Sequence, residues 1–146
     1  MALGSRCDVL IVEDNVMQCD EMADFLARAD LLVATAYDGA TARDKARLHE
    51  PRVVLLDFNL PDMTGVQLAE VLRALLPSAA IMMMSGRIDG LSEKTLAALG
   101  ITIFVNKPVP LGPLRNAVVK LVETSRHGQE APVQGGWMAG GVGSRR

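Results

Sequence analysis

The chain has 146 residues, of which 49% are apolar and 22% are charged, and its net charge is −2. This length fits one domain with a short extension, and the apolar fraction is sufficient for a large core. No apolar run approaches the ~18 residues that span a bilayer. Residues 1–6 lack the apolar stretch of a secretory signal. Basic residues do not form the clusters that nucleic-acid binding requires. These features predict a cytoplasmic protein with neither membrane nor nucleic-acid partners.

Five short apolar runs alternate with segments of helical periodicity. The runs are residues 9–12, 31–34, 53–56, 81–84 and 101–105. Continuous runs of this length are typical of parallel strands that are buried on both faces. Apolar residues at spacings of three and four mark the first, third and fifth helices: Val16, Cys19, Ala23 and Leu26; Leu68, Leu72 and Leu75; Leu114, Val118, Leu121 and Val122. Weaker patterns place the second and fourth helices at 41–50 and 91–99.

The repeated strand–helix unit predicts the fold class. Units of this kind form a parallel sheet with helices on both faces, because right-handed crossovers cover it. Five of them predict a flavodoxin-like, doubly wound (βα)5 fold, with the five-stranded parallel sheet in the order 2-1-3-4-5. In that order the winding reverses between the first and third strands, and ligand sites lie outside the carboxyl ends of the strands.

The last part of the chain differs in composition from the rest. We assign residues 7–124 to the domain and residues 125–146 to a C-terminal tail. Five glycines lie between residues 135 and 143, and Trp137 is the only aromatic residue in the tail. This composition predicts a mobile extension, and an interaction peptide centred on Trp137 is the alternative.

Polar side chains follow four of the predicted strands. Glu13 and Asp14 follow the first, and Asp57, Ser85 and Lys107 lie at the ends of the third, fourth and fifth. All five are therefore expected at one edge of the sheet. Three carboxylates that converge there would raise one another's pKa unless a cation joined them. Oxygen ligands beside a site for phosphate favour Mg²⁺.

This set of residues suits phosphoryl transfer. Asp57 can act as a carboxylate nucleophile toward phosphorus and form an aspartyl phosphate. Lys107 would supply a positive charge and Ser85 a hydroxyl donor to the phosphoryl oxygens. Taken singly, Asp14 could be a helix cap, Asp57 a turn residue and Lys107 a loop lysine. Their joint occurrence at separate strand ends favours the functional interpretation.

Five segments resemble the receiver-domain family of two-component response regulators, over roughly residues 7–124. They are Val12-Glu13-Asp14-Asn15, Asp38-Gly39, residues 56–65, Met84-Ser85-Gly86 and residues 104–108. The resemblance implies a signalling switch rather than an enzyme, with Asp57 as the phosphoacceptor. Its phosphodonor would be the phosphohistidine of a sensor histidine kinase or a histidine phosphotransfer protein.

The resemblance also implies the roles of individual residues. Asp14, Asp57 and the backbone carbonyl of Asn59 would bind Mg²⁺, with Glu13 assisting through water. Ser85 and Phe104 would be a switch pair, whose hydroxyl turns toward the phosphoryl group while the ring moves inward. The Lys107–Pro108 peptide bond would be cis. The switch would act on a surface made by helix 4, strand 5 and helix 5, which would bind a downstream protein target or a second copy as a homodimer.

Departures from the commonest family pattern are mild: Ser85 stands for threonine, Gly86 for alanine and Leu60 for methionine. Arg87 could reach the phosphoryl group and change its lifetime.

Two other functions stay open, a phosphorylation-independent pseudo-receiver and a small aspartyl-phosphate phosphatase. The phosphatase is disfavoured because Asn59 stands where a general acid is needed. The tail lacks a further periodic segment, so we expect a stand-alone single-domain regulator rather than a receiver excised from a longer protein.

Overall fold

Strands and helices alternate along the chain in the computed structural model, which describes residues 6–86, 93–127 and 136–138. The strands are β1 (Val9–Val12), β2 (Val33–Ala36), β3 (Val53–Asp57), β4 (Ala80–Ser85), β5 (Ile101–Asn106) and β6 (Gly136–Met138). The helices are α1 (Val16–Ala27), α2 (Gly39–His49), α3 (Gly65–Leu75), α4 (Glu93–Ala98) and α5 (Leu111–Arg126). None of the helices in these ranges is both long and apolar enough to cross a bilayer.

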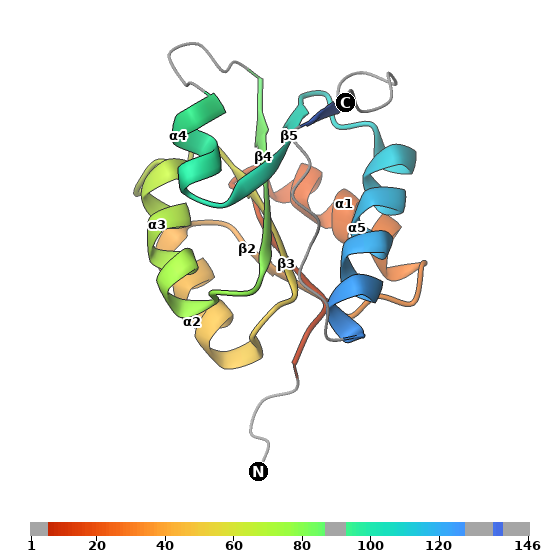
Figure 1. The fold of residues 1–146 in the computed structure, drawn as a ribbon. Coiled ribbons are helices and arrows are strands. Elements are labelled where there is room, and N and C mark those ends of the chain that lie inside the picture. Colours follow the sequence, from red (N-terminus) through yellow and green to blue (C-terminus); the bar gives the residue numbers. More distant parts are fainter. Residues whose placement is uncertain (1–5, 87–92, 128–135, 139–146) are drawn as a thin grey trace.

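The strands form one parallel sheet in the order β2-β1-β3-β4-β5-β6. The predicted order 2-1-3-4-5 is therefore confirmed for the first five strands. Helices α1 and α5 cover one face of the sheet, and α2, α3 and α4 cover the other (Figure 1). The winding reverses at β1, so the carboxyl ends of β1 and β3 lie side by side at the switch point.

The core has two halves, one on each face of the sheet. Successive side chains of a strand point to opposite faces, so Val9 and Ile11 of β1 pack on the side of α1 and α5. Leu10 and Val12 pack on the side of α2 and α3. All four are fully buried. Both faces are covered by helices, which explains why the central strands are apolar except at the carboxyl ends of β3 and β4.

The second strand begins two residues later than predicted, at Val33 rather than residue 31. The carbonyl of Leu32 accepts hydrogen bonds from the amides of Asp8 and Val9, at 2.8 and 3.1 Å, and the ladder register starts with Val9 opposite Val33. Leu31 is buried ahead of the strand, whereas the Leu32 side chain is 60% exposed. Hydrophobicity alone therefore placed the strand too early.

Helix α1 also differs in detail from its predicted apolar face. Cys19 and Leu26 are buried as expected, but Val16 in the first turn is 48% exposed. The fifth helix buries all four of its predicted core residues. The fourth helix is described over Glu93–Ala98 only, because the start of the predicted range lies outside the described residues.

The outer part of the sheet contains two features that local periodicity did not predict. The register between β4 and β5 shifts after Ile81, which pairs with Ile101, so that Met82 pairs with Ile103. Beyond β5, residues Gly136–Met138 of the tail add a sixth parallel strand (Figure 1). Part of the glycine-rich tail is thus an element of the sheet.

Candidate functional site

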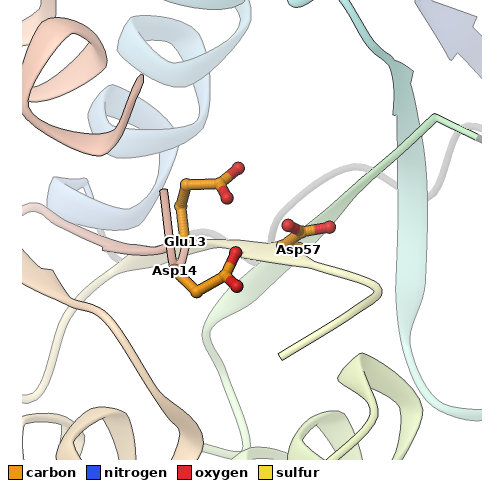
Figure 2. A group of neighbouring side chains, drawn as sticks. All are labelled: Glu13, Asp14 and Asp57. Carbon is orange, nitrogen blue, oxygen red and sulfur yellow. The ribbon is translucent and has the colours of Figure 1, made fainter. Parts of the chain in front are cut away.

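Three carboxylates converge at the carboxyl ends of β1 and β3 (Figure 2). Glu13 and Asp14 follow β1, and Asp57 is the last residue of β3. One carboxylate oxygen from each lies within 4.8 Å of the others. Glu13 and Asp57 are buried, at 1% and 5% exposure, and Asp14 is exposed. The cluster therefore opens to solvent on the side of Asp14.

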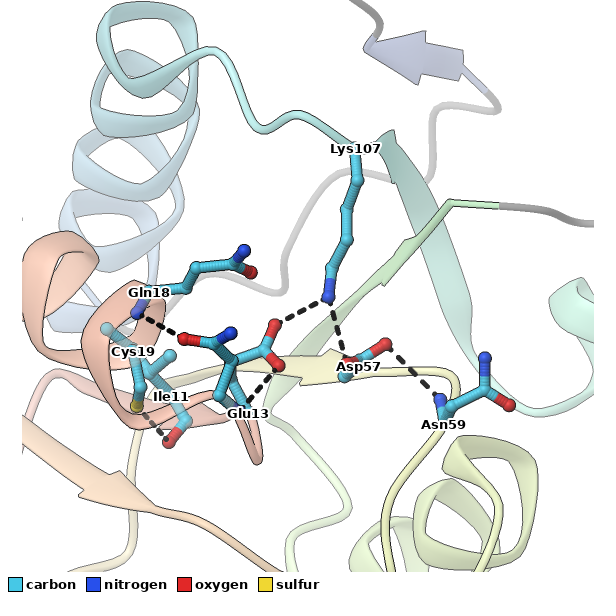
Figure 3. A network of polar contacts seen from close by, with 8 residues as sticks. Ile11, Glu13, Gln18, Cys19, Asp57, Asn59 and Lys107 are labelled. Atoms are coloured by element: carbon cyan, nitrogen blue, oxygen red, sulfur yellow. Dashed lines mark hydrogen bonds and ion pairs between the residues drawn. The ribbon is translucent and has the colours of Figure 1, made fainter.

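Lys107 lies opposite these carboxylates, directly after β5 (Figure 3). Its ammonium donates to Glu13 Oε1 at 2.6 Å and to Asp57 Oδ2 at 2.9 Å. Burial by itself would lower the pKa of Lys107, but the hydrogen bonds and charges of Glu13 and Asp57 outweigh it and raise that pKa. Lys107 is therefore a protonated counter-charge shared by two buried carboxylates.

Backbone amides hold the other carboxylate oxygens. Asp57 Oδ1 accepts from the amide of Asn59 at 3.2 Å, and Glu13 Oε2 accepts from the amide of Asn15 at 3.1 Å (Figure 3). The Asn15 side chain caps α1 by accepting from the amide of Gln18. The start of α1 and the end of β1 are thus tied to the same carboxylate cluster.

The β3–α3 connection is held from both ends. Gly65 approaches β3 so closely that a Cβ there would lie 2.6 Å from the Asp57 carbonyl oxygen. Thr64 and Gln67 form a capping box at the start of α3. Asp62 accepts from the amides of Gly39 and Ala40, at 2.8 and 3.0 Å, and these hydrogen bonds lower the pKa of Asp62. The connection that carries Asn59 is therefore anchored to α3 and to the start of α2. The sequence did not predict this role of Asp62, because no spacing pattern reveals it.

The structure places the predicted switch residues on neighbouring strands. Ser85, at the end of β4, is fully buried, and its carbonyl accepts from the amide of Lys107 at 3.0 Å. Phe104 of β5 is 3% exposed and packs in the core half that faces α4. The Lys107–Pro108 peptide bond is cis, as the resemblance implied. Arg87, the proposed lifetime residue, lies outside the described residues.

Gly86, which stands where alanine is usual, meets no described contact that would require glycine. A Cβ at this position would meet no described atom within 4 Å. The residues described around Gly86 therefore leave space for the alanine that is usual in the family.

The donor set fits a hard divalent cation. All three side chains offer carboxylate oxygens, and their spread of 4.8 Å is compatible with ligands on a single ion. Two of the three are buried, which makes an uncompensated cluster costly. Lys107 neutralises one charge, and a cation on the open side near Asp14 would neutralise the rest. These residues are thus suited to holding Mg²⁺.

Comparisons of sequence agree with this geometry. The family model of the response regulator receiver domain matches residues 9–119. The protein-glutamate methylesterase/protein-glutamine glutaminase of Photorhabdus laumondii is 35% identical over 108 residues, which cover 71% of this chain and 31% of that protein. The protein of the same name from Archaeoglobus fulgidus is 33% identical over 122 residues, which cover 79% and 35%. The chain thus spans about a third of the length of these curated relatives.

Solved structures share the fold. A CheY-like receiver domain protein of Methanospirillum hungatei has a TM-score of 0.76 at 25% identity, covering 84% of this chain and 99% of that one. CheY4 of Vibrio cholerae has a TM-score of 0.72 at 25% identity, covering 80% and 99%. A Saccharomyces cerevisiae receiver domain, solved with a histidine phosphotransfer protein, has a TM-score of 0.72 over 84% and 92%. At 19% identity, this last likeness concerns the fold alone.

Proposed function

This chain belongs to the response regulator receiver domain family, and from that premise we propose that it is a phosphoacceptor switch of a two-component phosphorelay, phosphorylated on Asp57. The observation that carries the proposal is the contact set of Asp57. Its carboxylate lies within 4.8 Å of those of Glu13 and Asp14, and 2.9 Å from the ammonium of Lys107. A nucleophilic carboxylate, a cation site and a positive charge for phosphoryl oxygens therefore meet at one point.

The transfer is an exchange at phosphorus. A carboxylate oxygen of Asp57 forms a bond to the phosphorus of a phosphohistidine on the donor protein, and the phosphorus–nitrogen bond breaks. The bonding electron pair stays on the imidazole nitrogen, which takes up a proton. Such a reaction asks the protein mainly for positioning and charge neutralisation. Lys107 supplies positive charge to the phosphoryl oxygens, and the Ser85 hydroxyl donates to one of them.

Asp14, Asp57 and the backbone carbonyl of Asn59 would hold Mg²⁺, with Glu13 assisting through water. When bound, the ion supplies positive charge that offsets the carboxylates and the phosphoryl oxygens. The chain's own part is to hold the carboxylates together against their repulsion. It does so through Lys107 and through the amides of Asn15 and Asn59.

The donor would approach over the first turn of α1. Val16 and Met17 follow the acidic pair and are 48% and 83% exposed. Next to them, a cavity of about 280 Å³ is lined by residues of α1 and by Lys107, Pro108 and Val109. Exposed apolar side chains beside the phosphoacceptor offer a contact surface to a histidine kinase or a histidine phosphotransfer protein. We place this encounter in the cytoplasm.

The output would be a change of partner binding. Ser85 and Phe104 would respond to the phosphoryl group and alter the surface made by α4, β5 and α5, to which a downstream target or a second copy would bind. We propose no catalytic turnover for the chain itself. Asn59 occupies the position where a phosphatase of the aspartyl-phosphate type needs an acid, and an amide cannot exchange a proton in that role.

The test is the intact mass of the protein after incubation with Mg²⁺ and acetyl phosphate. We expect a single Mg²⁺-dependent phosphoryl adduct on the wild type and none on Asp57→Asn. Asp44→Asn, at an exposed position of α2, is the matched control and should carry the adduct. The decay of the adduct in Arg87→Ala tests the lifetime proposal, which an unchanged decay rate would contradict.

Two outcomes favour the other functions. If neither acetyl phosphate nor beryllofluoride with Mg²⁺ binds at Asp57, the chain is a pseudo-receiver. If phosphate is released over many turnovers from small phosphomonoesters, and Asp57→Asn abolishes the release, the chain is a phosphatase.

A further inference from the structure

The two outer strands of a sheet present unpaired backbone groups, which invite pairing with another chain unless they are protected. Without β6, the edge strands of the sheet would be β2 and β5. Strand β2 has four residues, and the Lys45 ammonium covers part of its edge by donating to the Thr35 carbonyl at 2.6 Å. A short edge with a lysine on it is a common form of protection.

Strand β5 has no such protection in its own sequence. It reads Ile-Thr-Ile-Phe-Val-Asn, without a charged residue or a proline. Its six residues make it longer than β2, and it is built from residue types that favour strands. Left open, this edge would be suited to pairing with a second molecule.

The edge of β5 is occupied by β6. The two strands run parallel, with Ile103 opposite Gly136, Phe104 opposite Trp137 and Val105 opposite Met138. Figure 1 shows β6 as the dark blue arrow beside β5. Half of β5, including the proposed switch residue Phe104, thus has tail backbone as its neighbour.

The connection between the two strands is compatible with pairing within one molecule, although its hand is unusual. A parallel neighbour needs a crossover, usually a helix, and α5 supplies it. Helix α5 lies on the opposite face of the sheet from α2, α3 and α4, so the β5–α5–β6 crossover is left-handed, against the usual right-handed rule. Helix α5 runs back along the sheet and ends at Arg126, which donates to Asp8 beside the amino end of β1. Nine residues lie between Arg126 and Gly136. They can reach about 30 Å when extended, which exceeds the roughly 24 Å length of the 16-residue helix α5.

We propose that Gly136–Met138 is a built-in cover for the β5 edge, which the same molecule supplies, and that it prevents this edge from pairing with β5 of a second copy. The tail would thereby set the oligomeric state and limit access to the α4–β5–α5 surface. The inference does not depend on phosphoryl transfer, although it concerns the surface that the proposed function uses for output.

The first experiment weakens the cover in the full chain. Gly136→Pro and Met138→Pro each remove a backbone donor from β6 and keep Trp137, the only tryptophan of the protein. Gly141→Pro, outside β6, is the matched control. We expect both β6 variants to dimerise at least ten-fold more tightly in analytical ultracentrifugation, with faster hydrogen exchange in β5 before association. The control should behave as the wild type.

The second experiment asks which molecule supplies the strand. Ile103→Cys with Gly136→Cys places thiols at paired positions of β5 and β6. Oxidation should give a disulfide within a monomer, whereas a covalent dimer would show that the strand comes from a partner. Wild-type-like association and hydrogen exchange in both proline variants would overturn the proposal. Neither experiment uses a phosphodonor, so failure here leaves the proposed phosphoacceptor function standing, and failure of phosphorylation leaves this inference standing.

Discussion

The ammonium of Lys107 lies 2.9 Å from Asp57 Oδ2 and 2.6 Å from Glu13 Oε1. Lys107 comes from the end of β5, and the two carboxylates come from the ends of β3 and β1. One side chain therefore joins three strand ends across the switch point of the sheet. Because it neutralises Asp57, the proposed phosphoacceptor, together with Glu13, Lys107 affects both the geometry and the charge of the site.

Removal of Lys107 should slow phosphorylation strongly. In Lys107→Ala the phosphoryl oxygens lose a positive charge in a partly buried site, and the loss of one such donor costs about 10²-fold in rate. Time-resolved intact mass with acetyl phosphate and Mg²⁺ measures the effect. Lys120→Ala, at an exposed position of α5, should keep the wild-type rate. Equal rates for the two variants would show that Lys107 does not act on the transfer.

The close approach of Gly100 to Arg73 predicts that Gly100 is important for the stability of the protein. Gly100 has φ 79°, and a Cβ there would lie 2.6 Å from the Arg73 guanidinium. That guanidinium donates to five backbone carbonyls, those of Leu76, Pro77, Ala79, Leu99 and Gly100. Gly100→Ala combines a left-handed backbone with displacement of this side chain, so we expect it to lower the free energy of unfolding by about 1–3 kcal/mol.

Gly112 provides the control for Gly100. It lies in the first turn of α5, and a Cβ there would meet no described atom within 4 Å. Gly112→Ala should be neutral or raise the free energy of unfolding by about 0.5–1 kcal/mol. Urea denaturation measures both variants. Destabilisation of the same size in both would argue against a special role for Gly100.

Asp8 should be one of the most sensitive residues at the amino edge of the sheet. It is buried, accepts from the Leu32 amide and from Arg126, both at 2.8 Å, and lies 3.7 Å from Arg52. Asp8→Ala leaves these donors without their acceptor, and breaking a buried pair in this way costs about 3–5 kcal/mol. The partial exposure of both arginines places the expected loss at the lower end. Denaturant unfolding measures it, and Asp44→Ala is the exposed control.

A double-mutant cycle separates the Asp8–Arg126 pair from the other contacts of Asp8. Asp8→Ala, Arg126→Met and the double variant should give a coupling free energy between the two positions, since neighbours in one ion-pair network are not additive. Strict additivity would mean that Arg126 contributes nothing through Asp8.

Tyr37 should titrate above its ordinary pKa. Its hydroxyl donates to Asp20 Oδ1 at 2.8 Å, and this hydrogen bond is the main reason why the pKa of Tyr37 is raised. Because Tyr37 is the only tyrosine, the tyrosinate absorbance reports it directly. Asp20→Ala should lower this pKa toward about 10, whereas Asp24→Ala, on the same helix, should not change it.

The sign of the pH effect follows from the direction of that shift. The neutral phenol donates the hydrogen bond, so its contribution to stability is fully present below the pKa of the unfolded state. The contribution is lost as pH rises through the raised pKa of the folded state. The difference in unfolding free energy between wild type and Asp20→Ala should therefore shrink at high pH, and a constant difference would exclude this hydrogen bond as its source.

Much of the site could be predicted from the sequence because the predicted fold is a parallel sheet. In a parallel sheet every strand carries its carboxyl end to the same edge, so residues that follow separate apolar runs must meet there. Glu13, Asp14, Asp57 and Lys107 could be brought together in this way without any structure. The apolar runs and helical spacings were equally local signals, and they placed four of the first five strands within one residue of their observed bounds.

The tertiary structure decided what depends on partners distant in the chain. The start of β2 is set by hydrogen bonds from Asp8 and Val9. The β3–α3 connection is held by Asp62, which accepts from the amides that begin α2. Lys107 donates to both Glu13 and Asp57. Strand β6 is the clearest case, because three residues of a glycine-rich tail acquire their conformation from the open edge of β5. Local periodicity encodes which residues can be buried, whereas pairing between distant segments depends on which backbone groups the folded sheet leaves open.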